Sequence, residues 1–210
     1  MTVLRAFEHP QLPGKTITIE VAGNRDFPSV KWLFDTFSSG VYGFVPDSRI
    51  RKHINEGAVH VIKLDGDLIA AAIGKPGQTL WNIMTVPAYR HLHLGTLLVE
   101  VVRPERIRVK CRPHPGMSSQ ELSRFTDPTP FYEKLGFVEV GWDTPRNYYR
   151  GIDKATGRGK FVTRGTFHSV KIMRKLKPGE KAPEPDVTRG PKVEGSNPPG
   201  LEGKPRVKSF

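Results

Sequence analysis

The sequence has 210 residues, a length typical of one domain with a short appendage. Its 33 Lys and Arg against 21 Asp and Glu give a net charge of +12, which favours a polyanionic partner without indicating a fold. The single cysteine, Cys111, excludes a disulfide framework and a multi-thiolate zinc site. No apolar run approaches the roughly 18 residues of a membrane span, and residues 1–10 lack a signal-peptide pattern, so we expect a cytoplasmic protein without a membrane segment.

Strand and helix patterns alternate along the chain and predict an α/β fold with a mixed sheet. An Asp65-Gly66 pair between two apolar runs suits a type I′ turn and predicts a hairpin. Asp47 is the expected N-cap of the second helix, and Pro104 stops the third. The expected strands are residues 16–21, 59–64, 68–73, 80–86, 107–111, 137–142 and 167–176, and the expected helices are residues 27–37, 47–56, 94–102 and 129–135.

The composition changes after residue 176. Residues 178–210 include seven Pro and five Gly and show no apolar periodicity. Such a segment buries too little apolar surface to offset the entropy of ordering it, so residues 177–210 are expected to form a disordered tail. From residue 177 onward seven basic and five acidic residues give +2, which leaves +10 for the expected domain, residues 1–176.

The segment from Val86 to Thr96 lies between an expected strand and an expected helix. The first N–H groups of a helix are unpaired and coincide with the positive end of its dipole, so they form an anion site suited to a pyrophosphate. Gly95 allows close approach of the backbone to a phosphate, and Arg90 adds a charged donor. One Gly and one Arg in a strand–turn–helix unit are a weak signal by themselves.

A second segment, Phe131-Tyr132-Glu133-Lys134-Leu135-Gly136-Phe137, follows about 36 residues after Gly95. Together with the loop from Arg90 to Gly95, it resembles the signatures of the GNAT superfamily of acyl-CoA-dependent N-acyltransferases, over roughly residues 59–142. The resemblance implies a mixed, mostly antiparallel central sheet flanked by helices. It also implies transfer of an acetyl or related acyl group from acyl-CoA to an amine, and it does not indicate which amine.

The resemblance also implies roles for individual residues. The backbone amides from His91 to Thr96 would hold the CoA pyrophosphate, and the end of the preceding strand would pair with the pantetheine. Tyr132 would protonate the departing thiolate, although a buried aromatic of a short helix is the simpler structural interpretation. The implied cofactor-binding residues are Met84, Thr85, Val86, Arg90, His91, Leu92, His93, Leu94, Gly95 and Thr96.

Three positions depart from the pattern of this family. His93 stands where the loop usually has its first glycine, and Phe125 stands where many members have asparagine. The strand where some members place a basic glutamate reads Leu80-Trp81-Asn82-Ile83 and has no carboxylate. An alkylamine with a pKa near 10.4 is almost entirely protonated at pH 7, so a base or an already neutral acceptor is needed. Candidate bases are His60, Glu56 and Asp127.

The segment from residue 143 to 165 contains six basic and two acidic residues and four Gly. It would contact phosphates and stack on bases, through Arg146, Tyr148, Tyr149 and Arg150, or it would be an ordinary solvated hairpin. No metal site is expected, because the pairs His91-x-His93 and Cys111-x-x-His114 have no partners at a recognised spacing.

Three functions remain open on the sequence. The first is acylation of a small amine or a protein amine. The second is modification of a base amine in DNA or RNA, as in the Mom-type phage enzymes that share the superfamily fold; such an amine is neutral at pH 7 and suits the basic domain. The third is nucleic-acid binding by a non-catalytic member, which the departures at His93 and Phe125 would favour.

Overall fold

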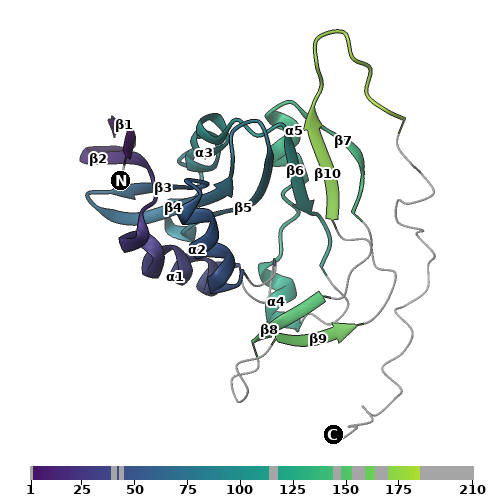
Figure 1. The fold of residues 1–210 in the computed structure, drawn as a ribbon, viewed down its shortest axis with the longest axis horizontal. Helices are drawn as coiled ribbons and strands as arrows, with labels where there is room; N and C mark the ends of the chain where they lie inside the picture. Colours follow the sequence, from purple (N-terminus) through teal and green to yellow (C-terminus); the bar gives the residue numbers. More distant parts are fainter. Residues whose placement is uncertain are drawn as a thin grey trace, which may run out of the picture.

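The computed structural model describes residues 2–38, 42, 45–113, 118–143, 148–152, 159–163 and 170–184. Eight strands form one sheet in the order β1-β2-β3-β4-β5-β6-β10-β7, and β8 and β9 pair apart from it (Figure 1). All neighbours in the large sheet are antiparallel except β5 and β6. The strands are β1 Thr2–His9, β2 Leu12–Val21, β3 Val59–Leu64, β4 Asp67–Gly74, β5 Thr79–Thr85, β6 Arg106–Lys110, β7 Phe137–Trp142, β8 Tyr148–Ile152, β9 Gly159–Thr163 and β10 Val170–Lys175.

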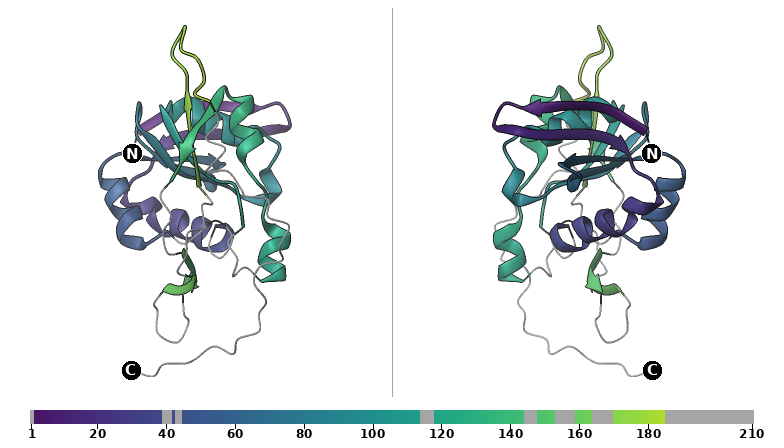
Figure 2. Two further views of the ribbon diagram at one scale, coloured as in Figure 1. Left: turned by 90° about the vertical axis from the view of Figure 1, so that its right-hand side faces the viewer. Right: turned by 90° about the vertical axis from the view of Figure 1, so that its left-hand side faces the viewer.

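Helices cover both faces of the sheet, and each face has its own core. The helices are α1 Phe27–Phe37, α2 Asp47–Asn55, α3 Leu94–Val102, α4 Ser119–Arg124 and α5 Thr129–Lys134. Apolar residues of α1 and α2 pack against Val59 and Val61 of β3 and Ala71 and Ile73 of β4, whereas α3 packs against the other face of these strands, with Ile62, Leu64, Ile69, Ala70 and Ala72. Figure 2 shows α1 and α2 on one side of the sheet. The mixed α/β fold class expected from the sequence is therefore confirmed.

Strand β4 lies between these two cores, which accounts for its run of small residues. Ala70, Ala71 and Ala72 are all fully buried, with Ala71 in the α1 core and the other two in the α3 core. A strand buried on both faces has a continuous apolar sequence, and here the alanines leave room for helices on either side. The expected hairpin before it is also present, because Asp65 and Gly66 both have positive φ, as a type I′ turn requires.

The sequence analysis missed the N-terminal strand β1. Residues Thr2 to Phe7 of this edge strand are exposed or half-buried, so no alternation of apolar and polar residues marks it. Its pairing with β2 over almost its full length holds it in the sheet instead. The analysis also missed α4, a six-residue helix that begins with a capping box in which Ser118 and Glu121 bond each other's backbone N–H groups.

Two expected boundaries differ from the structure. The N-cap of α2 is Pro46 and not Asp47, which is the first helical residue and whose carboxylate pairs with Lys31 instead. The expected last strand begins at Val170, and residues 164–169 lie outside the described part. Of the expected tail, residues 177–184 are described, and Glu180 forms an ion pair with Arg174 of β10. Residues 185–210 lie outside the described residues.

A buried ion triad joins β2, β3 and the turn before α1. The ammonium of Lys63 lies 2.8 Å from carboxylate oxygens of both Glu20 and Asp26, and all three residues are at most 9% exposed. Burial by itself would lower the pKa of Lys63, but its hydrogen bonds and charge attraction to the two carboxylates hold that pKa above 10.5. The ion pairs of Lys63 with Glu20 and Asp26 therefore link β3 to β2 and to the turn before α1, and each charge is stabilised by its buried partners.

Candidate active site

The only parallel neighbours in the described sheet separate after two residue pairs. Thr79 pairs with Arg106 and Leu80 with Ile107, and no further pairing joins β5 to β6 among the described residues (Figure 1). The other side of β5 remains paired with β4 through Thr85. The edge of β5 beyond Leu80 therefore presents backbone N–H and C=O groups to an opening in the sheet, where an extended chain can add like a strand.

The loop that follows β5 leads directly into the N-terminus of α3. The first helical hydrogen bond of α3 runs from Leu97 N–H to His93 C=O, so the N–H groups of Leu94, Gly95 and Thr96 precede the helical pattern. Arg90, His91 and His93 are exposed beside them. A helix N-terminus with exposed basic side chains beside it can bind an anion, and this one lies at the end of β5.

Two histidines of the loop adopt the left-handed conformation. His91 has φ 70° and His93 has φ 56° with ψ 16°, in a region that favours glycine and costs most other residues about 1 kcal/mol or more. His93 is the N-cap of α3 and makes no side-chain capping bond. The position where the family usually has glycine therefore keeps the backbone conformation of a glycine, although the residue is histidine.

Strand β1, which the sequence did not indicate, contributes a contact to this loop through its last residue, His9. The Nε2 atom of His9 lies 3.2 Å from the carbonyl oxygen of Leu92, and its Nδ1 accepts a hydrogen bond from Gln11 N–H at 3.2 Å. Because Nδ1 accepts, Nε2 carries the proton and donates to Leu92. His9 thus bonds to a loop residue that lies 83 positions later in the sequence. No motif marked His9.

The two sequence segments singled out above meet at Gly95. A Cβ atom at this position would lie 3.2 Å from the ring of Phe131, which comes from the second segment. Phe131 in turn stacks edge-on against Tyr132, with ring centroids 4.9 Å apart. The glycine is therefore needed for close packing of α3 against α5, in addition to any phosphate contact.

Substitution of Gly95 by valine should lower the free energy of unfolding by about 1–3 kcal/mol, because the added methyl groups displace the Phe131 ring from α3. Urea unfolding of the variant measures this loss. The double variant Gly95→Val with Phe131→Ala should lose less than the sum of the two single losses, since the small side chain makes room for the new one. Additive losses would contradict the contact.

Tyr132 belongs to α5 and is 5% exposed. It packs in the α3 core, edge-on to Phe131 and to Phe137. Burial, with a smaller contribution from Tyr42, raises the pKa of Tyr132 well above 10. The phenol therefore stays protonated at any physiological pH, as a proton donor must.

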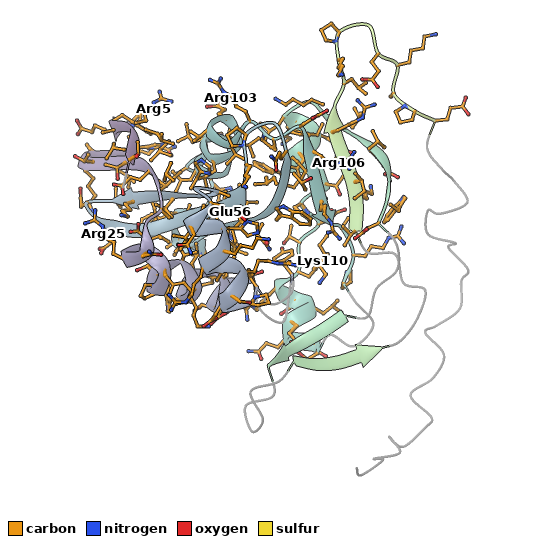
Figure 3. The ribbon with its side chains drawn as sticks, viewed as in Figure 1. Arg5, Arg25, Glu56, Arg103, Arg106 and Lys110 are labelled. Atoms are coloured by element: carbon orange, nitrogen blue, oxygen red, sulfur yellow. The ribbon has the colours of Figure 1, made fainter. Side chains whose placement is uncertain are left out.

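The face of the opening away from α3 carries basic and aromatic side chains. Arg106, Arg108 and Lys110 alternate with the core residues Ile107 and Val109 along β6, and Figure 3 shows Arg106 and Lys110 at its two ends. The guanidinium of Arg108 lies 5.0 Å from the centre of the Trp81 ring and also pairs with Asp143. Trp81 itself is 40% exposed at an irregularity in the pairing of β5 with β4.

The three residues considered as bases lie in different places. Glu56, just after α2, pairs with Lys75, which follows the end of β4. Asp127 accepts a hydrogen bond from Thr129 N–H at the beginning of α5. His60 is 4% exposed in β3, two strands away from the open edge of β5.

The imidazole of His60 makes the fold sensitive to acid. Its Nδ1 is buried without a hydrogen-bond partner in the described residues, and burial lowers the pKa of His60 below 6.5. The unfolded chain then binds the proton more readily, so the stability that this group contributes is complete above about pH 6.5 and is lost as the pH falls below it. The urea midpoint should drop between pH 7.5 and 5.5, less steeply in His60→Leu than in the wild type or in the exposed-histidine control His93→Asn. Equal slopes in all three would contradict this origin.

Other sequence-based candidates are placed only in part. Tyr148, Tyr149 and Arg150 are the first three residues of β8, whose backbone is described. Arg146 and His114 lie outside the described residues. One surface depression is lined by residues of β5 and β6, Trp81 and Arg106 among them, where the two strands begin to separate, and another lies elsewhere, beside Trp32 and Asp67. Among the described residues no three potential metal ligands cluster, and no described helix has the length and apolarity to cross a bilayer.

Residues 55–139 match the family model of the acetyltransferase (GNAT) domain. This part of the chain is therefore similar to a GNAT acetyltransferase domain. The match begins at the end of α2 and ends in β7, so it includes the open edge of β5, the loop before α3, and Tyr132. The β1–β2 hairpin with His9, and α1, lie outside the matched GNAT segment.

Solved structures of similar fold were also found. One is Naa50 from Arabidopsis thaliana in complex with a bisubstrate analogue, with 16% identity over 77% of this chain and 99% of that chain and a TM-score of 0.49. Another is the ribosomal-protein-S18-alanine N-acetyltransferase from Escherichia coli, with 21% identity over 76% of this chain and 92% of that chain and a TM-score of 0.47. The comparison with curated proteins finds no match to this sequence.

Proposed function

We propose that this protein is an N-acyltransferase that moves an acetyl or related acyl group from acyl-CoA to an amine. The observation that carries the proposal is the open edge of β5 beside the exposed N-terminus of α3. A ligand with a polar extended arm and a pyrophosphate matches both features at once. Acyl-CoA has this shape, and the GNAT match covers the same residues.

The cofactor contacts follow from this arrangement. Backbone groups of Met84, Thr85 and Val86 would pair with the amides of the pantetheine arm, in the way that a strand adds to a sheet edge. The pyrophosphate would lie on the N–H groups at the start of α3, with the exposed guanidinium of Arg90 adding a charged donor. The remaining residues proposed to line this phosphate site are His91, Leu92, His93, Leu94, Gly95 and Thr96.

Catalysis would combine alignment with polar stabilisation. A backbone N–H at the open edge of β5 would polarise the thioester carbonyl, and the acceptor nitrogen would attack its carbon. The C–S bond then breaks, and Tyr132 donates its phenolic proton to the departing thiolate. Even at ordinary pKa values this donation is uphill by about 2 kcal/mol, and the raised pKa of Tyr132 increases that cost. A path that returns a proton to Tyr132 is therefore part of the proposal.

A base amine of a nucleic acid is the second candidate acceptor. The alternate side chains of β6 on the face away from α3 are all basic, and the exposed Trp81 lies beside Arg108. Basic side chains next to an exposed aromatic suit phosphates and bases. An exocyclic base amine is also neutral at pH 7 and needs no prior deprotonation.

Binding of acetyl-CoA and the identity of the acylated product test these functions. Acetyl-CoA should raise the melting temperature of the protein, whereas a non-catalytic member of the family would show no shift. Mass spectrometry of nucleosides and of protein lysates from cells that express the protein should reveal an added acyl mass, absent from cells that express Tyr132→Phe. Modified nucleosides would select the nucleic-acid acceptor, and no thermal shift with no added mass would overturn the proposed function.

A further inference from the structure

Strand β6 ends in a lysine side chain at the open end of the sheet. Lys110 follows Val109, which belongs to the α3 core, so the lysine side chain lies on the opposite face of the strand. Its ammonium donates a hydrogen bond of 3.1 Å to the carbonyl oxygen of Tyr42, between α1 and α2. Figure 3 shows Lys110 at the end of β6 that lies away from the short paired segment with β5.

The two faces of the opening serve different ligands in the proposed reaction. The phosphate site belongs to α3 and lies on the α3 face, so the cofactor reaches the opening from that side. An acceptor must then reach the thioester carbon from the side of α1, α2 and Tyr42. Lys110 lies on this side, at the level where β5 and β6 have already separated.

We propose that the Lys110 amine is the base that takes the proton from the acceptor amine before it attacks the thioester. This inference rests on the proposed acyltransferase function and adds to it the base that the β5 sequence does not supply. The hydrogen bond to Tyr42 fixes the direction of the side chain, and the nitrogen of a neutral lysine has a lone pair that can take a proton.

The surroundings of Lys110 favour its neutral form. Burial lowers the pKa of Lys110 to about 8, so roughly one molecule in ten carries the neutral amine at pH 7, against about one in 2,500 for an ordinary lysine. The charged groups described on this face are Arg108, two residues earlier on β6, and Asp143 just after β7, which pairs with Arg108. Arg112 lies over the Trp142 ring, and Lys171 pairs with Glu139 on the α3 face.

The protons balance without another reactant. A protonated acceptor gives one proton to Lys110 and becomes a neutral amine, whose nitrogen forms the new bond to the thioester carbon. The C–S bond breaks, the thiolate takes the proton of Tyr132, and the second proton of the attacking nitrogen restores Tyr132. Lys110 then releases its proton to water. One amide, one free CoA thiol and one proton result from each acyl-CoA and ammonium consumed.

Acceptors of different basicity test this role in kinetics. With tyramine, which is protonated at pH 7, Lys110→Met and Lys110→Arg should each lower kcat/KM by about 100-fold or more. With hydroxylamine, which is neutral at pH 7, both variants should lose less than about 10-fold. The wild-type pH profile with tyramine should bend near pH 8, and the bend should be absent from both variants. The matched control Lys171→Arg changes a neighbouring strand lysine on the opposite face and should retain the wild-type profile.

Competitive acetylation with acetic anhydride, read by peptide mass spectrometry as a function of pH, gives the titration of Lys110 without any acceptor. A midpoint near 8 supports the proposal, whereas a midpoint above about 10, the ordinary lysine value, overturns it. Unchanged tyramine kinetics in both Lys110 variants would also overturn it, even if acyl transfer itself is intact. Failure of the wild-type protein to bind acetyl-CoA would instead overturn the proposed function, so the two failures are distinguishable.

Discussion

Tyr132→Phe should lower the rate of acyl transfer by about 100-fold or more and leave the affinity for acyl-CoA nearly unchanged. The substitution removes only a hydroxyl, and a positioned general acid typically contributes roughly 10²–10⁴-fold to a rate. The ring would still fill its place in the α3 core against Phe131 and Phe137. Release of the CoA thiol measures the rate, and titration calorimetry with acetyl-CoA measures the affinity.

A tyrosine outside the proposed machinery provides the control for this experiment. Tyr89, which packs against the same core before the phosphate loop, should tolerate Tyr89→Phe with a rate within a few fold of the wild type. If Tyr132→Phe retains the full rate, Tyr132 is only a core aromatic and the leaving thiolate takes its proton from water. If acetyl-CoA affinity falls along with the rate, the hydroxyl acts in binding and not in proton transfer.

Lys63→Met should lower the free energy of unfolding by about 3–5 kcal/mol, because it leaves two buried carboxylates facing each other without their cation. Urea unfolding at neutral pH measures the loss. The triple variant Lys63→Met, Glu20→Gln and Asp26→Asn should recover most of it, since the amides carry no charge. The amide oxygen introduced by Asp26→Asn can still accept from Gly23 N–H. A triple variant as unstable as Lys63→Met would show that lost packing, and not unpaired charge, causes the loss.

The same triad predicts a plateau of stability between acid and base. Burial by itself would raise the pKa of Asp26, but Lys63 and the Gly23 N–H together hold it below 3.8, so its contribution is present above that pH and is lost as the pH falls. The pKa of Lys63 is held above 10.5, so its contribution is present below that pH and is lost as the pH rises. Lys63→Met should flatten both losses in urea midpoints measured across the pH range.

Local patterns were sufficient for most of the fold. The Asp65-Gly66 turn between two apolar runs and the apolar spacing of α1 each specify an element through neighbouring residues, and the structure confirms both. Strand β1 has no such pattern, because most of its side chains are exposed. Its pairing with β2 holds it in the sheet instead. A six-residue helix such as α4 is likewise too short to show a helical period.

Part of the candidate site was also readable from the sequence, since the loop before α3 and the Tyr132 segment are each continuous in the chain. The contact of Gly95 with Phe131 joins these two segments, and no spacing rule indicates it. The same is true of the hydrogen bonds from His9 to Leu92 and from Lys110 to Tyr42. Alternation along β6 places Lys110 opposite the core residues, which is a signal available in the sequence, but it does not indicate what that face meets.

The sequence by itself determined the α/β class and the place of most of the positive charge, and it indicated the proposed phosphate loop and the tyrosine segment, because each depends on residues close together in the chain. Only the tertiary structure decided that β5 and β6 separate after Leu80 and that Lys110 lies on the side of the opening away from α3. The physical reason is that pairing register and burial depend on segments far apart in the sequence. The net charge of +12 favoured a polyanionic partner when only the sequence was considered. In the fold, part of this positive charge lies on the basic face of β6, beside the proposed acceptor path.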